Sequence, residues 1–213
     1  MLIKSIIFDF DGVIVNSTKI KDQAFKKIVE IYPKQNQLKF INFHKKNLGI
    51  SRVLKFKYLY KTILKKSFSK KDIDKLSDKF QKIVYKKIIK LKVSNGLKKF
   101  IKYNSKKYDL YISSGTPENE LKKIMSIKKI DKNFKNIYGS PSTKSQHIKK
   151  IIKNDNIKND NIIFVGDGLS DYKAARVNKI KFIQVGKNFK MKSIKYKITY
   201  GCNINKIIER IKN

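Results

Sequence analysis

The sequence predicts an α/β protein with a parallel sheet, interrupted near its N-terminus by a block of helices. A short apolar run, Ile3–Phe8, ends abruptly in Asp-Phe-Asp-Gly, as a buried strand does when it enters a turn. From about residue 20 to residue 91 apolar residues recur at helical spacing, whereas after Asn95-Gly96 short apolar runs alternate with helical patterns. Alternating strands and helices favour a Rossmann-like parallel sheet covered by helices on both faces.

Within the helical block, two helices are marked by apolar residues three or four positions apart. A segment over 51–64 between them is also expected to be helical, and Ser69 is the expected N-cap of the second helix. We therefore expect a core domain of residues 1–17 and 93–213 and an inserted helical cap of residues 18–92. The apolar positions are Ile20, Ala24, Phe25, Ile28 and Ile31 in the first helix and Ile73, Leu76, Phe80, Ile83, Val84 and Ile88 in the second.

The second half of the chain carries the remaining expected strands and helices. Pro117 is expected to open the first of these helices, because proline suits the first helical position. Further helices are expected around Ile148–Ile152, around Ala174-Ala175 and over 204–211. The expected strands are Leu110–Ser113, Phe134–Tyr138, Ile162–Val165 and Lys181–Val185.

The single cysteine is typical of a protein from a reducing compartment, and the length is sufficient for a hydrophobic core. A chain of 213 residues can bury a hydrophobic core without disulfides, and its single cysteine, Cys202, has no partner for an internal bridge. The N-terminal apolar run is too short for a signal peptide, and no window reaches the ~20 apolar residues of a membrane span. We expect a cytoplasmic protein with no membrane partner, and the sequence leaves open whether it is a monomer or a homodimer.

The net charge of +36 comes almost entirely from lysine. Of the 52 lysines and arginines only Arg52, Arg176 and Arg210 are arginines, and the lysines are spread along the whole chain. Nucleic-acid surfaces usually cluster arginine and lysine with groups that read bases. A compositional bias towards Lys, Asn and Ile explains the charge, so we expect no specific nucleic-acid partner, although weak binding to polyanions at low salt should occur.

Polar residues follow three of the expected strands directly. Asp9 and Asp11 follow the first strand, Ser113 and Ser114 stand at the end of the second, and Asp167 follows the strand at Ile162–Val165, with Asp171 four residues later. In an open parallel sheet the carboxyl ends of the strands form the ligand site. Carboxylates crowded at one edge repel one another unless a cation lies among them, and oxygen ligands favour Mg²⁺.

These residues together resemble the four motifs of the haloacid dehalogenase superfamily. The motifs are Asp9-Phe-Asp-Gly-Val-Ile-Val-Asn-Ser17, Ser114 after a strand, Lys144, and Gly166-Asp167-Gly-Leu-Ser-Asp171. They occur in the family's order between Ile3 and about Val185. The inserted helices are similar to the small cap of the phosphoglycolate phosphatase and phosphoglucomutase branches. The resemblance implies the fold of that superfamily and a hydrolase that uses Mg²⁺.

The resemblance also implies a role for each motif residue. Asp9 would attack phosphorus and form an aspartyl-phosphate, and Asp11 would protonate the leaving alcohol and then activate water. Family members that act on halides or phosphonates lack a carboxylate at the position of Asp11, which points to phosphate esters here. Metal ligands would come from Asp9, Asp11 through its backbone carbonyl, Asp167 and Asp171. The alternative for Asp9 is an ordinary aspartate in a strand-ending turn.

The remaining motif residues would hold the phosphoryl group. Ser114 would hydrogen-bond it, with Ser113 as a competitor for this role, and the backbone N–H of Gly115 would assist. Lys144 would neutralise the charge that builds on the phosphoryl oxygens. These hydroxyls could instead serve a turn, and a lysine could match by chance in so lysine-rich a chain.

Substrate selection is expected in the cap, over the stretch His44–Phe56. Arg52 would bind a carboxylate or second phosphate of the substrate in bidentate fashion, or else it is a helix-surface arginine. We expect His44 to be a surface or cap-packing residue. Lys21 could face the cleft from the first cap helix, but we expect a solvated lysine there, and we assign no role to His147 or Cys202.

The sequence thus predicts a Mg²⁺-dependent phosphatase that hydrolyses a small phosphorylated metabolite, of the phosphoglycolate or sugar phosphate type, through an aspartyl-phosphate. A phosphomutase of the same superfamily would pass the phosphoryl group to a sugar instead of water. A third possibility, from another class, is a non-catalytic lysine-rich protein that binds polyanions on the same scaffold.

Overall fold

The computed structural model describes residues 2–202 and 204–212, and its sheet is the parallel one expected. The described residues form a sheet of six strands in the order β3-β2-β1-β4-β5-β6, with every neighbouring pair parallel. The strands are β1 (Ser5–Phe8), β2 (Asp109–Pro117), β3 (Asn136–Ser140), β4 (Ile162–Gly166), β5 (Lys181–Val185) and β6 (Tyr196–Ile198).

The register of the central strands brings their carboxyl ends to one level. Phe8 of β1 lies opposite Ile112 of β2 and Val165 of β4. The residues that follow these three positions, Asp9 among them, therefore leave the sheet at the same edge. This edge is the expected ligand-binding edge of a parallel sheet whose strand order reverses beside β1.

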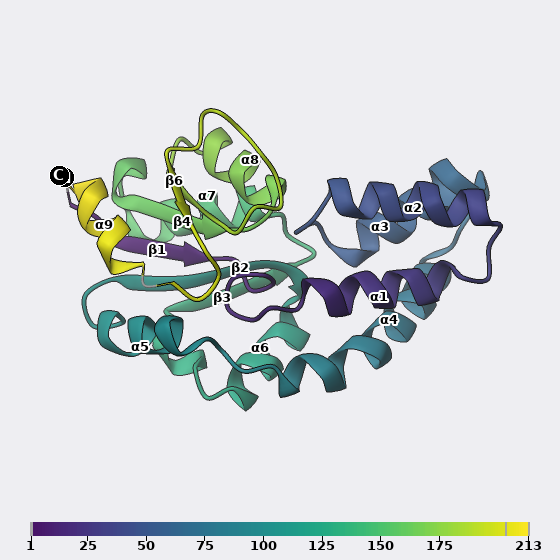
Figure 1. Cartoon of the computed structure of the whole chain (residues 1–213), viewed down its shortest axis with the longest axis horizontal. Coiled ribbons are helices and arrows are strands. Elements are labelled where there is room, and N and C mark those ends of the chain that lie inside the picture. Colours follow the sequence, from purple (N-terminus) through teal and green to yellow (C-terminus); the bar gives the residue numbers. More distant parts are fainter. Residues whose placement is uncertain (1, 203, 213) are drawn as a thin grey trace.

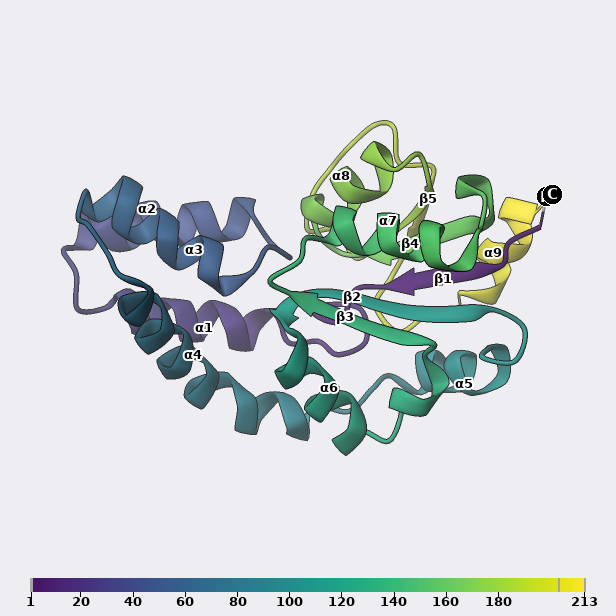
Figure 2. The same ribbon diagram turned by 180° about the vertical axis from the view of Figure 1, so that it is seen from behind.

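Helices cover both faces of the sheet, as Figures 1 and 2 show. Alternate residues of β1 explain this, because Ile6 and Phe8 enter one hydrophobic cluster while Ile7 enters another on the opposite face. The first cluster includes apolar residues of α5 (Asn95–Asn104), α6 (Glu118–Ile127) and α9 (Asn205–Lys212), and the second those of α7 (Lys144–Asp155) and α8 (Leu169–Val177). Single 3₁₀ turns lie at Asp131–Asn133 and Asn159–Asn161.

The inserted helices form a group beyond the carboxyl edge of the sheet, at the right in Figure 1. They are α1 (Thr18–Val29), α2 (Lys34–Lys46), α3 (Arg52–Tyr58), a π-helix η1 (Leu59–Leu64) and α4 (Lys70–Lys90). Buried phenylalanines from all four α-helices meet in the middle of the group: Phe25, Phe40, Phe56 and Phe80. Such aromatic contacts hold these helices together, and the phenylalanines belong to the same hydrophobic cluster as Ile6 and Phe8 of β1.

Several element boundaries differ from those expected. The first cap helix ends at Val29, which leaves Ile31 71% exposed. The expected helix over 51–64 changes at Leu59 into a π-helix that ends at Lys65 in a left-handed conformation. Strand β2 extends through Pro117, so that α6 begins one residue later than expected. Helix α2 lies within the block expected to be helical, whereas neither α5 nor the short edge strand β6 was expected from the sequence.

The helix start at Ser69 is confirmed. The Ser69 hydroxyl accepts a hydrogen bond from the backbone N–H of Asp72 at 3.2 Å, and the Asp72 carboxylate accepts one from the Ser69 N–H at 2.8 Å, which completes a capping box. This cap starts α4, a lysine-rich helix of 21 residues. Within 2–202 and 204–212, no helix is both long enough and apolar enough to cross a membrane.

Candidate active site

Asp9 lies at the end of β1 and is almost completely buried. Its backbone N–H donates to the carbonyl of Val165 on β4 at 2.9 Å, which continues the sheet by one residue. Its Oδ1 accepts a hydrogen bond from the N–H of Phe10 at 2.7 Å, and the residue is 1% exposed. The sheet and the following turn therefore fix this carboxylate in one orientation.

Lys144, at the start of α7, is the cation that faces Asp9. Its Nζ lies 2.8 Å from Oδ2 of Asp9, an ion pair without the alignment of a hydrogen bond, and it also donates to Oδ1 of Asp171. The helix is started by Thr143, whose hydroxyl accepts from the N–H of Gln146 at 3.3 Å. Burial alone would lower the pKa of Lys144, but Asp171 and Asp9 outweigh it and raise that pKa.

Three buried carboxylates come together beside this lysine. Asp9, Asp167 and Asp171 each offer an oxygen within 4.8 Å of the other two. Asp171 accepts from the N–H of Gly168 at 2.9 Å, and Asp167 accepts from the side-chain amide of Asn188 at 2.7 Å. Both bonds hold the carboxylates at the end of β4, where their mutual repulsion needs compensation.

The pKa values of this cluster show an excess of negative charge. Burial, and after it the charge of Asp171, raises the pKa of Asp167 to about 7. Burial also raises the pKa of Asp9 well above its ordinary value; Lys144 opposes the rise, and Asp171, Asp167 and Asp11 add to it. One lysine is thus too little positive charge for these carboxylates. An all-oxygen donor set of this kind fits Mg²⁺, which would keep the carboxylates ionised.

The side chain of Asp11 takes part in a different set of contacts. Its Oδ1 accepts from the hydroxyl of Ser17 at 2.6 Å, and its Oδ2 accepts from the ammonium of Lys21 and from the hydroxyl of Thr116 at 3.3 Å. Burial would raise the pKa of Asp11, but Lys21 and the hydrogen bond from Ser17 lower it below its ordinary value. Lys21 also donates to the Thr116 hydroxyl at 2.9 Å. The expectation of a solvated lysine at position 21 was therefore wrong.

Gly12 is required by the turn that follows Asp11. Its φ of +76° is one that side chains rarely adopt, and a Cβ at this position would lie 2.0 Å from Oδ2 of Asp167. The turn between β1 and the cap thus runs directly against the carboxylate at the end of β4. No other residue type fits without moving Asp167.

The two serines at the end of β2 point into different surroundings. The Ser113 hydroxyl hydrogen-bonds Nδ1 of His147 at 2.8 Å, and Nε2 of His147 lies 3.1 Å from the carbonyl of Gly139. Because a carbonyl can only accept, Nε2 carries the proton and Nδ1 accepts from Ser113. The Ser114 hydroxyl instead accepts a hydrogen bond from the N–H of Thr116 at 3.1 Å, and with Gly115 and Lys144 it lines a cavity separate from the one that Asp9 and Asp11 line. His147, which was given no role, is therefore a buried residue that engages Ser113.

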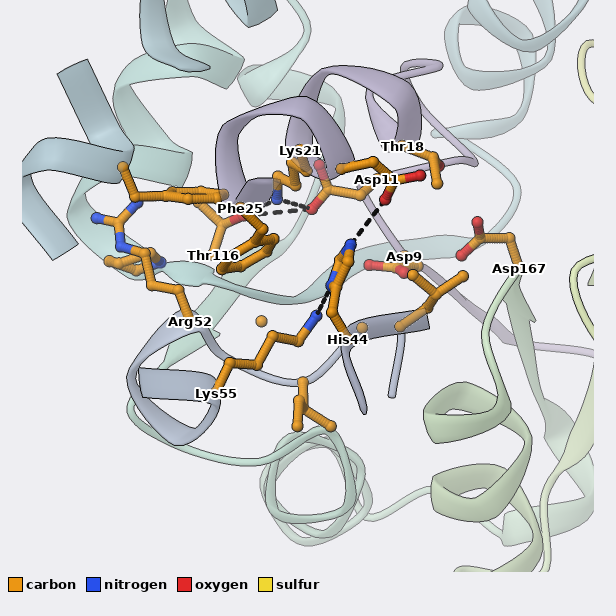
Figure 3. A pocket seen from close by; sticks show the side chains of 17 residues that line it. Asp9, Asp11, Thr18, Lys21, Phe25, His44, Arg52, Lys55, Thr116 and Asp167 are labelled. Atoms are coloured by element: carbon orange, nitrogen blue, oxygen red, sulfur yellow. Dashed lines mark hydrogen bonds and ion pairs between the residues drawn. The ribbon is translucent and has the colours of Figure 1, made fainter. Parts of the chain in front are cut away.

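The carboxylates open into a cavity between the core and the cap, shown in Figure 3. The empty space in it is about 570 Å³ when the open solvent at its mouth is included. The cap loop at 48–50 closes one side: Ser170 donates to the carbonyl of Leu48 at 2.8 Å, and a Cβ on Gly115 would lie 2.5 Å from the carbonyl oxygen of Gly49. The cavity is lined by Asp9, Asp11, Thr18, Lys21, Asp22, Phe25, His44, Leu48, Gly49, Ile50, Arg52, Lys55, Phe80, Gly115, Thr116, Pro117 and Asp167.

Arg52 is neither a solvated surface residue nor a free binding group in this structure. One guanidinium nitrogen lies 2.8 Å from Oε2 of Glu120 on α6, and both side chains are buried. The guanidinium also lies over the ring of Phe80, 5.5 Å from its centre. In Figure 3 it is turned away from Asp9. Arg52 thus joins the cap to the core by a buried ion pair.

Three polar residues of the cavity and its rim were given no role from the sequence. Lys21 was seen but expected in solvent, and its position one helical turn after Ser17 could have placed it near Asp11. Lys55, one turn after Arg52 on α3, is 3% exposed and contacts His44, which is itself buried. Asn188 lies in the loop after β5, and no spacing in the sequence connects it to Asp167.

Comparison with known proteins agrees with this fold. Residues 6–185 match the model of the family described as haloacid dehalogenase-like hydrolase. Similar solved structures include a β-phosphoglucomutase from Clostridium difficile, 20% identical with a TM-score of 0.80 over 99% of this chain and 98% of that one. A predicted phosphoglycolate phosphatase from Haemophilus somnus is 15% identical, with a TM-score of 0.74 over 97% of this chain and 98% of that one.

A hydrolase from Pseudomonas syringae is also similar, at 18% identity and a TM-score of 0.78 over 98% of this chain and 99% of that one. Identities this low establish a common fold and leave the reaction open. No curated protein matches the sequence. The family match covers the inserted helices and the strands from β1 to β5 with the carboxylates at their ends, and the chain therefore belongs to the haloacid dehalogenase-like hydrolases, a family of enzymes.

Proposed function

We propose that this enzyme is a Mg²⁺-dependent phosphatase that hydrolyses a small phosphomonoester, of the phosphoglycolate or sugar phosphate type, through an aspartyl-phosphate on Asp9. The observation that carries the proposal is the pairing of Asp9 with Lys144 at 2.8 Å, together with a second carboxylate, Asp11, which lines the same cavity as Asp9. A nucleophile, a cation for the phosphoryl oxygens and an acid/base are the groups that this reaction needs.

In the first step, an oxygen of Asp9 would attack phosphorus while the bond from phosphorus to the ester oxygen breaks. Asp11 would give its proton to that leaving oxygen. In its present contacts Asp11 is ionised, because Lys21 lowers its pKa. The acid role therefore requires the contact with Lys21 to weaken when the substrate phosphate, itself an anion, enters and attracts the ammonium.

In the second step, water would attack phosphorus and the bond to Asp9 would break, releasing inorganic phosphate. Asp11 would accept the proton of that water, a role that its ionised state already suits. Ser114, the N–H of Gly115 and Lys144 would hold the phosphoryl oxygens in both steps. The Ser113 hydroxyl is engaged with His147, which favours Ser114 for this contact.

Asp9, Asp167 and Asp171 would hold Mg²⁺, with Asp11 contributing its backbone carbonyl. The ion would offset the negative charge of the substrate phosphate beside these carboxylates. The division into a core of 1–17 and 93–213 and a cap of 18–92 belongs to the same proposal, because a cap that opens and closes at residues 17–18 and 92–93 would admit the substrate and then exclude water.

The test is release of inorganic phosphate from a panel of phosphorylated small molecules, with Mg²⁺ and with a chelator. We expect Mg²⁺-dependent release from at least one member of the panel. Conversion of a hexose 1-phosphate to its 6-phosphate without phosphate release would show a phosphomutase instead. Polyanion binding that persists in high salt, with no turnover of any ester, would contradict both and favour the binding protein.

A further inference from the structure

The cap contributes one buried lysine whose charge has no acidic partner. Lys55 on α3 is 3% exposed, and its Nζ lies 2.8 Å from Nδ1 of His44 on α2. Nε2 of His44 lies 2.7 Å from a carboxylate oxygen of Asp22 on α1. Since that carboxylate accepts, Nε2 carries the proton and Nδ1 accepts a hydrogen bond from Lys55. Figure 3 shows the Lys55 amine directed at the His44 ring inside the cavity.

The other cationic side chains at the cavity each face a carboxylate. Lys21 is paired with Asp11, and Arg52 with Glu120. The Asp9 carboxylate faces Lys144. By contrast, no carboxylate of residues 2–202 and 204–212 comes within ion-pair distance of Lys55.

A buried ammonium without an anion nearby is destabilised by its lost hydration. This burial, and after it the charge of Lys21, lowers the pKa of Lys55 to about 7; Lys144 adds to the effect, and Asp11 and Asp22 oppose it. The same burial lowers the pKa of His44, which keeps the imidazole neutral and able to accept. An anion in the cavity would supply the charge that Lys55 lacks.

We propose that the Lys55 ammonium binds a second anionic group of the substrate, a carboxylate or a second phosphate, at the end remote from the phosphoryl group held at Asp9. This inference rests on the phosphatase function proposed above and names its substrate class. His44 and Asp22 are positioning residues in this proposal, because Asp22 orients the His44 ring and the ring orients the Lys55 amine. The Lys55 amine also lies over the ring of Phe25, 5.0 Å from its centre.

Three non-hydrolysable phosphonates of matched length provide the probes. Propylphosphonate has an uncharged end, 3-phosphonopropionate replaces its methyl with a carboxylate, and propane-1,3-bisphosphonate carries a second phosphonate. Their affinities are measured by calorimetry in the presence of Mg²⁺, so that the readout does not depend on turnover. All three ligands carry the same phosphonate group, so its ionisation affects each dissociation constant alike. The effect cancels when the dissociation constants are compared as ratios.

We expect the wild-type protein to bind at least one doubly charged ligand about tenfold or more tightly than propylphosphonate. The ligand with the larger increase in affinity over propylphosphonate identifies the second group as carboxylate or phosphate. Lys55→Met should remove this preference, and Lys55→Arg should retain it. Lys57→Met is the matched control, because Lys57 lies exposed on the same helix, and its preference should equal that of the wild type.

The pH dependence separates binding by Lys55 from a purely structural role. The wild-type preference should decline as the pH rises through about 7, whereas that of Lys55→Arg should hold, because a guanidinium stays protonated. Equal binding of all three ligands by the wild type, or an unchanged preference in a folded Lys55→Met protein, would overturn the inference alone. Failure of every phosphonate to bind would overturn the phosphatase proposal and the inference with it.

Discussion

Arg52 of the cap and Glu120 of the core form a buried ion pair, with 2.8 Å between guanidinium nitrogen and carboxylate oxygen. The pair links α3 to α6 across the cavity that holds Asp9. Both partners lie out of water, so each depends on the other for its charge balance. The contact between the cap and the core at this point therefore depends on both charges.

Glu120→Gln should destabilise the protein by about 3–5 kcal/mol, because it leaves the Arg52 charge buried and unpaired. Urea unfolding measures the loss. The double variant Arg52→Met/Glu120→Leu should lose less than Glu120→Gln, since it removes both charges. Lys122→Met, which breaks the exposed pair with Glu118, is the control and should cost less than about 1 kcal/mol. Equal losses of stability in Glu120→Gln and Lys122→Met would show that the buried ion pair contributes no more to stability than the exposed one.

His147 should make the protein less stable as the pH falls from 6.5 to 4. Burial lowers its pKa to about 4 from 6.5, so in this range the unfolded chain binds a proton that the folded protein excludes. The contribution of the unprotonated His147 to the free energy of unfolding is present in full above pH 6.5 and amounts to at most about 3 kcal/mol. His147→Gln keeps a donor and an acceptor without titrating. Stability curves against pH that run parallel for this variant and the wild type would contradict the prediction.

Gly12→Ala should abolish phosphate release, because its Cβ would lie 2.0 Å from Oδ2 of Asp167 at a φ of +76°. Gly186→Ala is the matched control. Its φ is +71°, but no atom lies within 4 Å of the added Cβ, so only the backbone strain of about 1–2 kcal/mol should appear. Rates of phosphate release and urea midpoints measure both effects. An active Gly12→Ala enzyme would show that Asp167 can move without loss.

Mg²⁺ should raise the unfolding temperature, since an ion held only by the folded protein stabilises it by about 2.7 kcal/mol at a hundredfold excess over its dissociation constant. Asp167→Asn should lose most of this rise, because it removes a carboxylate of the cluster with Asp9 and Asp171. Asp109→Asn, at an exposed position on the first residue of β2, should keep the full rise. The same rise in both variants would place the ion elsewhere.

The carboxylate edge of the sheet could be predicted because it depends on local signals. The abrupt end of an apolar run locates Asp9 and Asp167 at strand ends, and parallel strands then bring them to one edge. The helical spacing of apolar residues likewise located the buried faces of α1 and α4. Such patterns reflect burial, which repeats with the period of each element.

The partners of individual charged side chains could not be predicted in the same way. Glu120 lies 68 positions after Arg52, and the contact exists only because the cap folds back onto α6. Asn188 reaches Asp167 from an irregular loop, where no period applies. The change from α3 to a π-helix at Leu59 also has no signal in apolar spacing, because the two helix types differ by a single hydrogen-bond register.

The central claim is that the Asp9 carboxylate attacks phosphorus, and the rate of phosphate release by Asp9→Asn tests it most directly. The amide is a poor nucleophile of nearly the same size, so kcat/KM on the best ester of the panel should fall at least about a thousandfold. Asp160→Asn, an exposed aspartate at a 3₁₀ turn, should retain wild-type activity. An Asp9→Asn enzyme that releases phosphate as fast as the wild type would contradict the account.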